Sequence, residues 1–217
     1  MAIDDTLKSF MDKLKMPDFS GMDWKGSTEG LRNAFYKASR SVERDLPDLA
    51  EISNLVVDGA DGPLKARLYV PLAAGIAPAP AIVFFHGGGF VLGDLDTHDV
   101  ICRRLAASSR CRVLSVDYRL APEHPFPAAP EDAYSAFQWL ASQAVELDVD
   151  TNNIAVAGDS AGGNLAVATS LLCRDRGGPQ PARQCLLYPA IDAACDSDSM
   201  HEFAEGYLLS REQMRWF

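Results

Sequence analysis

The chain of 217 residues is long enough for one folded domain, and 47% hydrophobic with 23% charged residues is ordinary for a globular protein. Its formal net charge of −10 argues against nucleic acid and anionic membrane surfaces as partners, because both would repel it. No apolar run reaches the roughly 18 residues of a membrane span, and the start lacks a basic leader before an apolar block, so we expect no secretory signal.

The first 47 residues are predicted to be mainly helical. Apolar residues recur at helical spacing on either side of a loop-like stretch, 17–30: Leu7, Phe10, Met11 and Leu14 before it, Leu31, Phe35 and Val42 after it. Such a region can cover a site or add a packing layer. We interpret residues 1–47 as an N-terminal helical cap region and residues 48–217 as the core.

The core is predicted to begin with a hairpin of strands 52–57 and 65–70, followed by a Pro/Ala loop. Strands and helices then alternate: strand 81–85, helix 98–109, strand 112–116, helix 131–143, strand 154–157, a helix to about residue 173, and strand 184–188. Asp96 or Thr97 is the expected N-cap of helix 98–109. This alternation predicts an α/β fold with a mostly parallel, doubly wound sheet and right-handed crossovers.

One stretch between a strand and a helix points to nucleophilic chemistry. Residues 158–162, Gly-Asp-Ser-Ala-Gly, fit G-x-S-x-G, in which the chain turns so sharply that the serine is strained and exposed. The Ala161 N–H and the helix dipole would favour negative charge beside Ser160. The alternative is an ordinary glycine-rich turn with a bystander serine.

A second motif, His86-Gly-Gly-Gly-Phe90, follows strand 81–85 directly. Three glycines cost backbone entropy and bury nothing, which makes sense if the loop presents N–H groups to a developing oxyanion. The candidate oxyanion hole is therefore Gly87, Gly88, Gly89 and Ala161. A flexible turn is the alternative; a phosphate-binding loop is disfavoured because neither glycine-rich nucleotide pattern fits.

These two motifs, together with Val116–Tyr134, resemble the hormone-sensitive-lipase-like bacterial carboxylesterases, a branch of the α/β-hydrolase fold. The resemblance runs from about residue 55 to the end and includes residues 205–209, Glu-Gly-Tyr-Leu-Leu. It implies hydrolysis of short-chain carboxylic esters through an acyl-enzyme, without a metal or organic cofactor. The N-terminal helices would then cover the site.

The same resemblance implies roles for particular residues. Ser160 would be the nucleophile, and the N–H groups of Gly88, Gly89 and Ala161 would hold the oxyanion. His86 would help to hold the glycine loop. The run 118–127 would be structural, with prolines that fix a buried turn and with polar contacts from its charged residues, Arg119 and Glu123.

A serine also needs a histidine oriented by a carboxylate. The resemblance places both after two further strands, in Asp-Pro-Leu and His-Gly-Phe segments that do not occur in this sequence. His86 belongs to the glycine loop and His124 to the proline-fixed turn. His201 is the only histidine after Ser160, but the resemblance puts it on an excursion towards the cap, so a substitute triad with a nearby aspartate is disfavoured.

We therefore expect the triad acid and base to be absent from this chain, the C-terminal strands of the sheet to be missing, and the isolated chain to show little turnover. Strand 184–188 would then be an apolar sheet edge, completed by a second polypeptide, domain exchange or self-association. The rival hypothesis is a non-catalytic hydrolase-fold protein that binds a small molecule.

Metal and disulfide chemistry are not expected. Five scattered cysteines without a C-x-x-C pair favour reduced thiols in the cytoplasm. The stretch 94–99, Asp-Leu-Asp-Thr-His-Asp, invites a metal-site interpretation, but a capped helix start explains the same residues.

Overall fold

The computed structural model describes residues 4–6, 8–9, 28–41, 45–72 and 77–217. The chain divides into two compact units: Asp45–Ile191, and Met1–Arg44 together with Asp192–Phe217. Among the described residues, every helix is too short or too polar to cross a membrane.

The larger unit contains a six-stranded mixed sheet with the strand order β1-β2-β4-β3-β5-β6. The hairpin β1–β2 and the pair β2–β4 are antiparallel, whereas β4, β3, β5 and β6 run parallel to one another. The strands are β1 (Leu49–Gly59), β2 (Gly62–Pro71), β3 (Ala79–Phe85), β4 (Arg112–Val116), β5 (Val149–Asp159) and β6 (Arg183–Leu187). The predicted doubly wound α/β sheet is confirmed.

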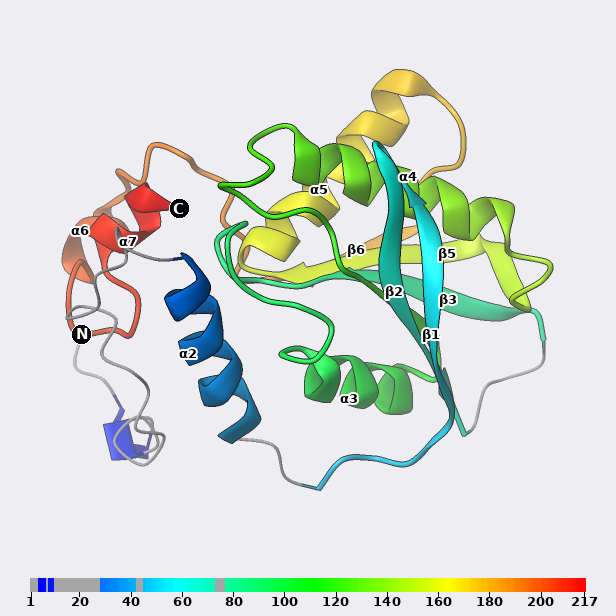
Figure 1. Ribbon diagram of the computed structural model, residues 1–217, viewed down its shortest axis with the longest axis horizontal. Helices are drawn as coiled ribbons and strands as arrows, with labels where there is room; N and C mark the ends of the chain where they lie inside the picture. Colours follow the sequence, from blue (N-terminus) through cyan, green and yellow to red (C-terminus); the bar gives the residue numbers. More distant parts are fainter. Residues whose placement is uncertain (1–3, 7, 10–27, 42–44, 73–76) are drawn as a thin grey trace. The chain divides into compact units, whose positions relative to one another are not determined.

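Three helices connect the parallel strands and cover both faces of the sheet, as Figure 1 shows. Helix α3 (Asp99–Ser109) packs on one face around Phe84 and Cys102. Helices α4 (Ala128–Ser142) and α5 (Ala161–Arg176) pack on the other face in a larger cluster. Because β3 and β4 are covered on both faces, they carry continuous apolar runs rather than an alternating pattern.

Two predicted helix starts were wrong. Helix α3 begins at Asp99 with His98 at the N-cap, because Asp94 and Thr97 bond to each other's backbone in a separate turn just before it. Helix α4 begins at Ala128, three residues before the predicted start, with Pro127 at its N-cap. Neither N-cap side chain accepts a hydrogen bond from its helix.

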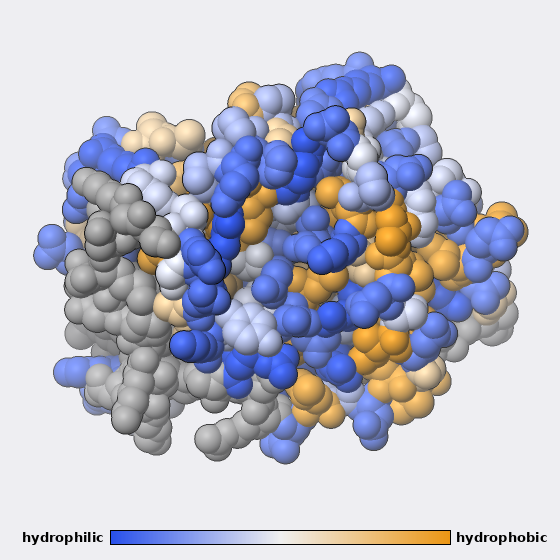
Figure 2. All heavy atoms as spheres, viewed as in Figure 1, coloured by the Kyte–Doolittle hydropathy of each residue, from blue (hydrophilic) through white to orange (hydrophobic). Residues whose placement is uncertain are grey.

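Strand β6 is the outermost strand on one side of the sheet, as predicted from its position in the sequence. Its side chains are nevertheless mostly exposed, including Cys185 and Leu187, and Tyr188 just after it is 74% exposed. At the opposite edge of the sheet, Val56 of the hairpin β1–β2 is also exposed. Figure 2 shows hydrophobic areas interspersed with hydrophilic ones on the face in view.

The regular elements described in the smaller unit are helices. It contains α2 (Thr28–Ser41), α6 (Asp198–Glu202) and α7 (Arg211–Trp216). The second predicted N-terminal helix is confirmed as α2, in which Leu31 is buried. The other predicted features of this region lie outside the described residues. They are the run 7–14 apart from residues 8 and 9, the predicted loop up to residue 27, and Val42.

Candidate active site

Ser160 lies at the sharp turn between β5 and α5. Its backbone has φ 52° and ψ −116°, in a region that a residue with a side chain enters only under strain. A Cβ at Gly162 would overlap the carbonyl oxygen of Phe85, so the helix can approach β3 this closely only with glycine there. The strained serine predicted from G-x-S-x-G is present at this turn.

The segment after β6 fixes this turn from one side. The Ser160 N–H donates to the carbonyl of Leu187 at 2.9 Å, and the Ser160 carbonyl accepts from the Ala190 N–H at 3.1 Å. The Asn164 side-chain amide in turn donates to the Ala190 carbonyl at 2.8 Å. The edge strand is therefore part of what holds the serine in its conformation.

The glycine loop that follows β3 lies at the same carboxyl edge of the sheet. Gly88 has φ 124°, which a residue with a side chain rarely adopts, and its carbonyl accepts from the N–H groups of Val91 and Leu92. Within the described part of the chain, the N–H groups of Gly88, Gly89 and Ala161 have no acceptor. Three backbone donors thus remain available near Ser160.

Gly87 differs from the sequence expectation. Its N–H donates to Oδ1 of Asp159 at 2.9 Å, so it is already engaged and is not available to an oxyanion. The reason is that Asp159, the residue before the serine, turns its carboxylate back against the glycine loop. No sequence pattern indicates this pairing, because the two residues lie at the ends of different strands, β3 and β5.

His86 is fully buried beneath the loop. Its Nδ1–H donates to the Gly87 carbonyl at 2.9 Å, and its ring stacks on Tyr118 with the ring centroids 4.4 Å apart. The Tyr118 hydroxyl donates to the His86 carbonyl at 2.7 Å. Burial, together with nearby His98, lowers the pKa of His86 to about 4, so the ring is neutral at pH 7 and positions the loop rather than acting as a base.

Asp159 has a second neighbour that motif reasoning missed. The Nε2 atom of His98 lies 3.6 Å from Asp159 Oδ1, and both side chains are nearly inaccessible to water. Burial acts to raise the pKa of Asp159, but His98 and the Gly87 N–H outweigh it and hold the pKa below its usual range. The carboxylate is therefore charged at pH 7.

The turn predicted to be structural is tied into the core by Arg119. Its guanidinium donates to both carboxylate oxygens of Asp132, which is fully buried, and to exposed Asp61. Asp132 also accepts from the N–H groups of Arg119 and Ala60. The polar contact expected of Arg119 is present.

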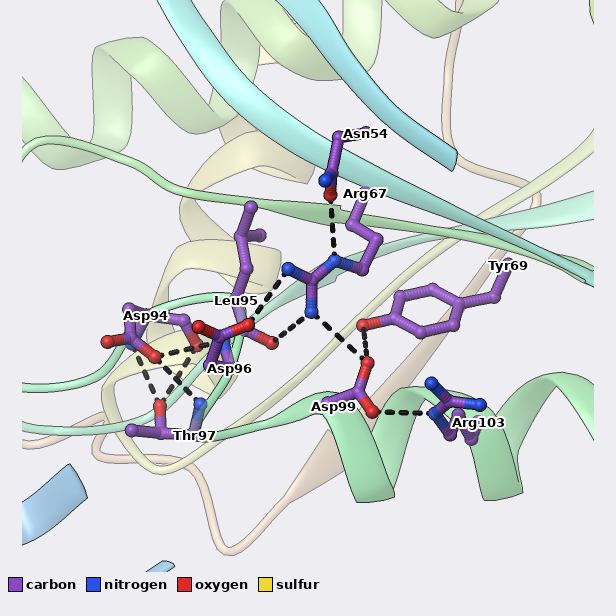
Figure 3. A network of polar contacts seen from close by, with 9 residues as sticks. All are labelled: Asn54, Arg67, Tyr69, Asp94, Leu95, Asp96, Thr97, Asp99 and Arg103. Carbon is purple, nitrogen blue, oxygen red and sulfur yellow. Dashed lines mark hydrogen bonds and ion pairs between the residues drawn. The ribbon is translucent and has the colours of Figure 1, made fainter. Parts of the chain in front are cut away.

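The stretch 94–99 forms an ion-pair network rather than a metal site, as Figure 3 shows. Arg67 on β2 contacts Asp96 at 2.8 Å and Asp99 at 3.2 Å. Across the described residues, no group of three potential ligands is close enough to hold a metal ion.

A pocket of about 450 Å³ lies beside this network but contains neither Ser160 nor the glycine loop. Charges of both signs line it, and Arg67 is paired with Asp96. Its lining residues are Asn54, Leu55, Val56, Lys65, Ala66, Arg67, Asp94, Leu95, Asp96 and Asp117.

Of the two remaining histidines, one belongs to each unit. His124 is exposed in the proline-rich turn, and its N–H donates to the Leu120 carbonyl. His201 belongs to the smaller unit, where its Nε2 lies 2.9 Å from Asp196 Oδ1. That exposed pair matches the order considered for a substitute triad.

Known proteins resemble this chain throughout its length. A family described as alpha/beta hydrolase fold matches residues 82–217. Carboxylic ester hydrolase LipN of Mycobacterium tuberculosis is 46% identical over 172 residues, covering 77% of this chain and 45% of LipN. Esterase LipI of the same organism is 43% identical over 191 residues, covering 83% of this chain and 60% of LipI.

A solved structure shows the same fold. Ester hydrolase EH1AB1, from the metagenome of Lake Arreo and complexed with a bipyridine phosphonate derivative, is 40% identical with a TM-score of 0.91. The match covers 99% of this chain and 69% of EH1AB1. The chain thus spans between 45% and 60% of the length of the two mycobacterial relatives.

Proposed function

This chain belongs to the hormone-sensitive-lipase-like carboxylesterases of the α/β-hydrolase fold, and from that premise we propose that it acts in the hydrolysis of short-chain carboxylic esters. The observation that carries the proposal is the strained Ser160 beside three backbone N–H groups without acceptors among the described residues. Such an arrangement suits an oxygen nucleophile and a developing oxyanion, and it suits little else.

The proposed reaction proceeds through an acyl-enzyme. The Ser160 oxygen adds to the ester carbonyl carbon as its proton passes to a base, and the carbonyl oxygen becomes an oxyanion. The N–H groups of Gly88, Gly89 and Ala161 hold that oxyanion. The alcohol then leaves with the proton, and water adds to the acyl-serine and releases the carboxylic acid. One such donor is typically worth about 10²–10³ in kcat.

We propose further that none of the four histidines is the base of this reaction. His86 is neutral, buried and bonded to the glycine loop, and His98 faces Asp159 rather than Ser160. His124 is exposed in a turn, and His201 is engaged with Asp196. Turnover by these residues alone should therefore be low, and the triad acid and base come from another segment.

Such a segment would pair with β6, the exposed edge of the sheet. Exposed apolar side chains at and beyond this strand, Leu187, Tyr188 and Ile191, fit a partner that adds strands and covers them.

Two measurements test the proposed function. Hydrolysis of p-nitrophenyl acetate by this chain is expected to equal that of its Ser160→Ala variant; a clear excess that also disappears in His201→Ala would show that His201 is the base. Titration of the ¹⁵N-labelled chain with butyrate, a product anion, should shift the amide resonances of Gly88, Gly89 and Ala161. Unshifted resonances at millimolar butyrate would refute the proposed oxyanion hole.

A further inference from the structure

Asp159 joins the two halves of the candidate site. It precedes Ser160 in the turn, and the same carboxylate oxygen that accepts from the Gly87 N–H faces His98. The contact to Gly87 fixes the start of the glycine loop relative to the serine. Since Gly88 and Gly89 follow directly, their N–H directions depend on where Gly87 is held.

His98 supplies the polar partner that keeps this carboxylate in place. Nε2 of His98 lies 3.6 Å from Asp159 Oδ1, so this edge of the imidazole faces the carboxylate. The other ring nitrogen, Nδ1, lies 2.9 Å from the Thr97 hydroxyl oxygen. The imidazole is thus positioned between Thr97 and Asp159, with its Nε2 edge towards the carboxylate.

The segment that carries His98 is itself anchored to the sheet. Asp94 Oδ1 accepts from the N–H groups of Asp96 and Thr97, closing the turn before α3. Arg67 holds this turn through Asp96 and holds the first residue of α3 through Asp99 (Figure 3).

Asp99 receives two further contacts on the other side of the anchor. Tyr69 donates to its Oδ1 at 2.8 Å, and Arg103 contacts its Oδ2 at 2.6 Å. Burial acts to raise the pKa of Asp99, but Arg103 and Tyr69 hold it below the usual range, so the anchor is charged at pH 7. Arg67 and Tyr69 of β2 therefore hold Asp99, the first residue of α3, directly beside His98.

We propose that His98 is a positioning residue that, through Asp159, locks the glycine loop to the Ser160 turn and so sets the directions of the Gly88 and Gly89 N–H groups. The proposal rests on the proposed function, since it concerns the oxyanion hole of that same site. Without the imidazole of His98, the buried carboxylate of Asp159 loses a polar neighbour and is expected to leave Gly87 for water. The loop would then open while the rest of the sheet stays folded.

Amide hydrogen exchange in the ¹⁵N-labelled 217-residue chain tests this without requiring turnover. In His98→Leu, exchange at the Gly87 amide, which donates to Asp159, should accelerate by about tenfold or more, and the amide resonances of Gly88 and Gly89 should shift as the loop moves. His98→Gln, whose amide can place an N–H where Nε2 stands, should stay within about threefold of wild type. The matched control is His124→Leu at an exposed histidine, which should leave these amides unchanged.

Two results would overturn the proposal. One is unchanged exchange at the Gly87 amide in His98→Leu. The other is an equal acceleration in the amides of β2, which would mean that His98 only supports the core as a whole. Butyrate titration of the same samples separates the failure of this proposal from the failure of the proposed function. Wild-type amide resonances that butyrate does not shift would refute the oxyanion hole. Faster exchange of the loop amides in His98→Leu alone would still support the positioning role of His98.

Discussion

Replacing Asp132 of helix α4 by alanine should strongly destabilise the larger unit. Its carboxylate is fully buried and accepts hydrogen bonds from four donors: the Arg119 N–H, Nε and Nη2 at 3.1, 2.8 and 2.9 Å, and the Ala60 N–H at 3.0 Å. It therefore joins the β1–β2 turn, the segment after β4 and helix α4. Removing one partner of a buried ion pair costs about 3–5 kcal/mol, because the other charge is left without compensation.

The measurement is urea unfolding followed by far-ultraviolet circular dichroism. With a slope of about 2–3 kcal/mol per molar urea, the midpoint of Asp132→Ala should fall by about 1–2 M. Asp61→Ala is the matched control, since Asp61 pairs with the same arginine at 3.1 Å but is 84% exposed. That variant should lose only about 0–1 kcal/mol of unfolding free energy. Equal losses in the two variants would refute the argument that burial decides the value of these pairs.

Three further predictions follow from other contacts. Gly162→Ala should abolish the butyrate-induced amide shifts and lower the thermal midpoint, because its Cβ would overlap the Phe85 carbonyl oxygen; a variant that behaves like wild type would contradict this packing. Burial lowers the pKa of His86 from 6.5 to about 4, so between these two pH values the unfolded chain binds a proton that the folded chain does not. The unfolding free energy should therefore fall by about 3 kcal/mol as the pH is lowered from 6.5 to 4. His86→Phe should remove that part of the pH dependence in denaturant titrations, and an identical slope would argue against a neutral buried ring. With Ellman's reagent, the exposed Cys185 thiol should react quickly. The buried Cys102 thiol, whose pKa burial raises to about 12, should react only after unfolding. Protection of Cys185 on adding a candidate partner would indicate pairing at β6.

Local pattern predicted most of the sheet correctly. Strand β4 has the predicted bounds, because a strand covered on both faces is mostly apolar; Val113, Leu114 and Val116 are buried, and Ser115 is its one buried polar residue. The hairpin β1–β2 was also predicted, since a turn-forming sequence stands between two strand patterns. Ser160 and the glycine loop were found because their chemistry is encoded in consecutive residues.

The contacts that hold the candidate site were not predictable in the same way. Asp159 and Gly87 are neighbours only because β3 and β5 pair in parallel, and Arg67 reaches Asp99 only after α3 docks on the sheet. The sequence around Asp159 does not indicate which distant N–H group its carboxylate will accept a hydrogen bond from. The same limit explains the error about Gly87, which the glycine run alone made equivalent to its two neighbours.

The clamp on Ser160 bears on the order in which the protein is made. The serine is synthesised before Leu187 and Ala190, whose backbone groups hold it in its strained conformation. A nascent chain that has emerged only as far as α5 lacks those two hydrogen bonds, so nothing from β6 yet opposes relaxation of the turn. The two backbone hydrogen bonds that hold Ser160 in its strained conformation can therefore form only after residues 187–190 have been made.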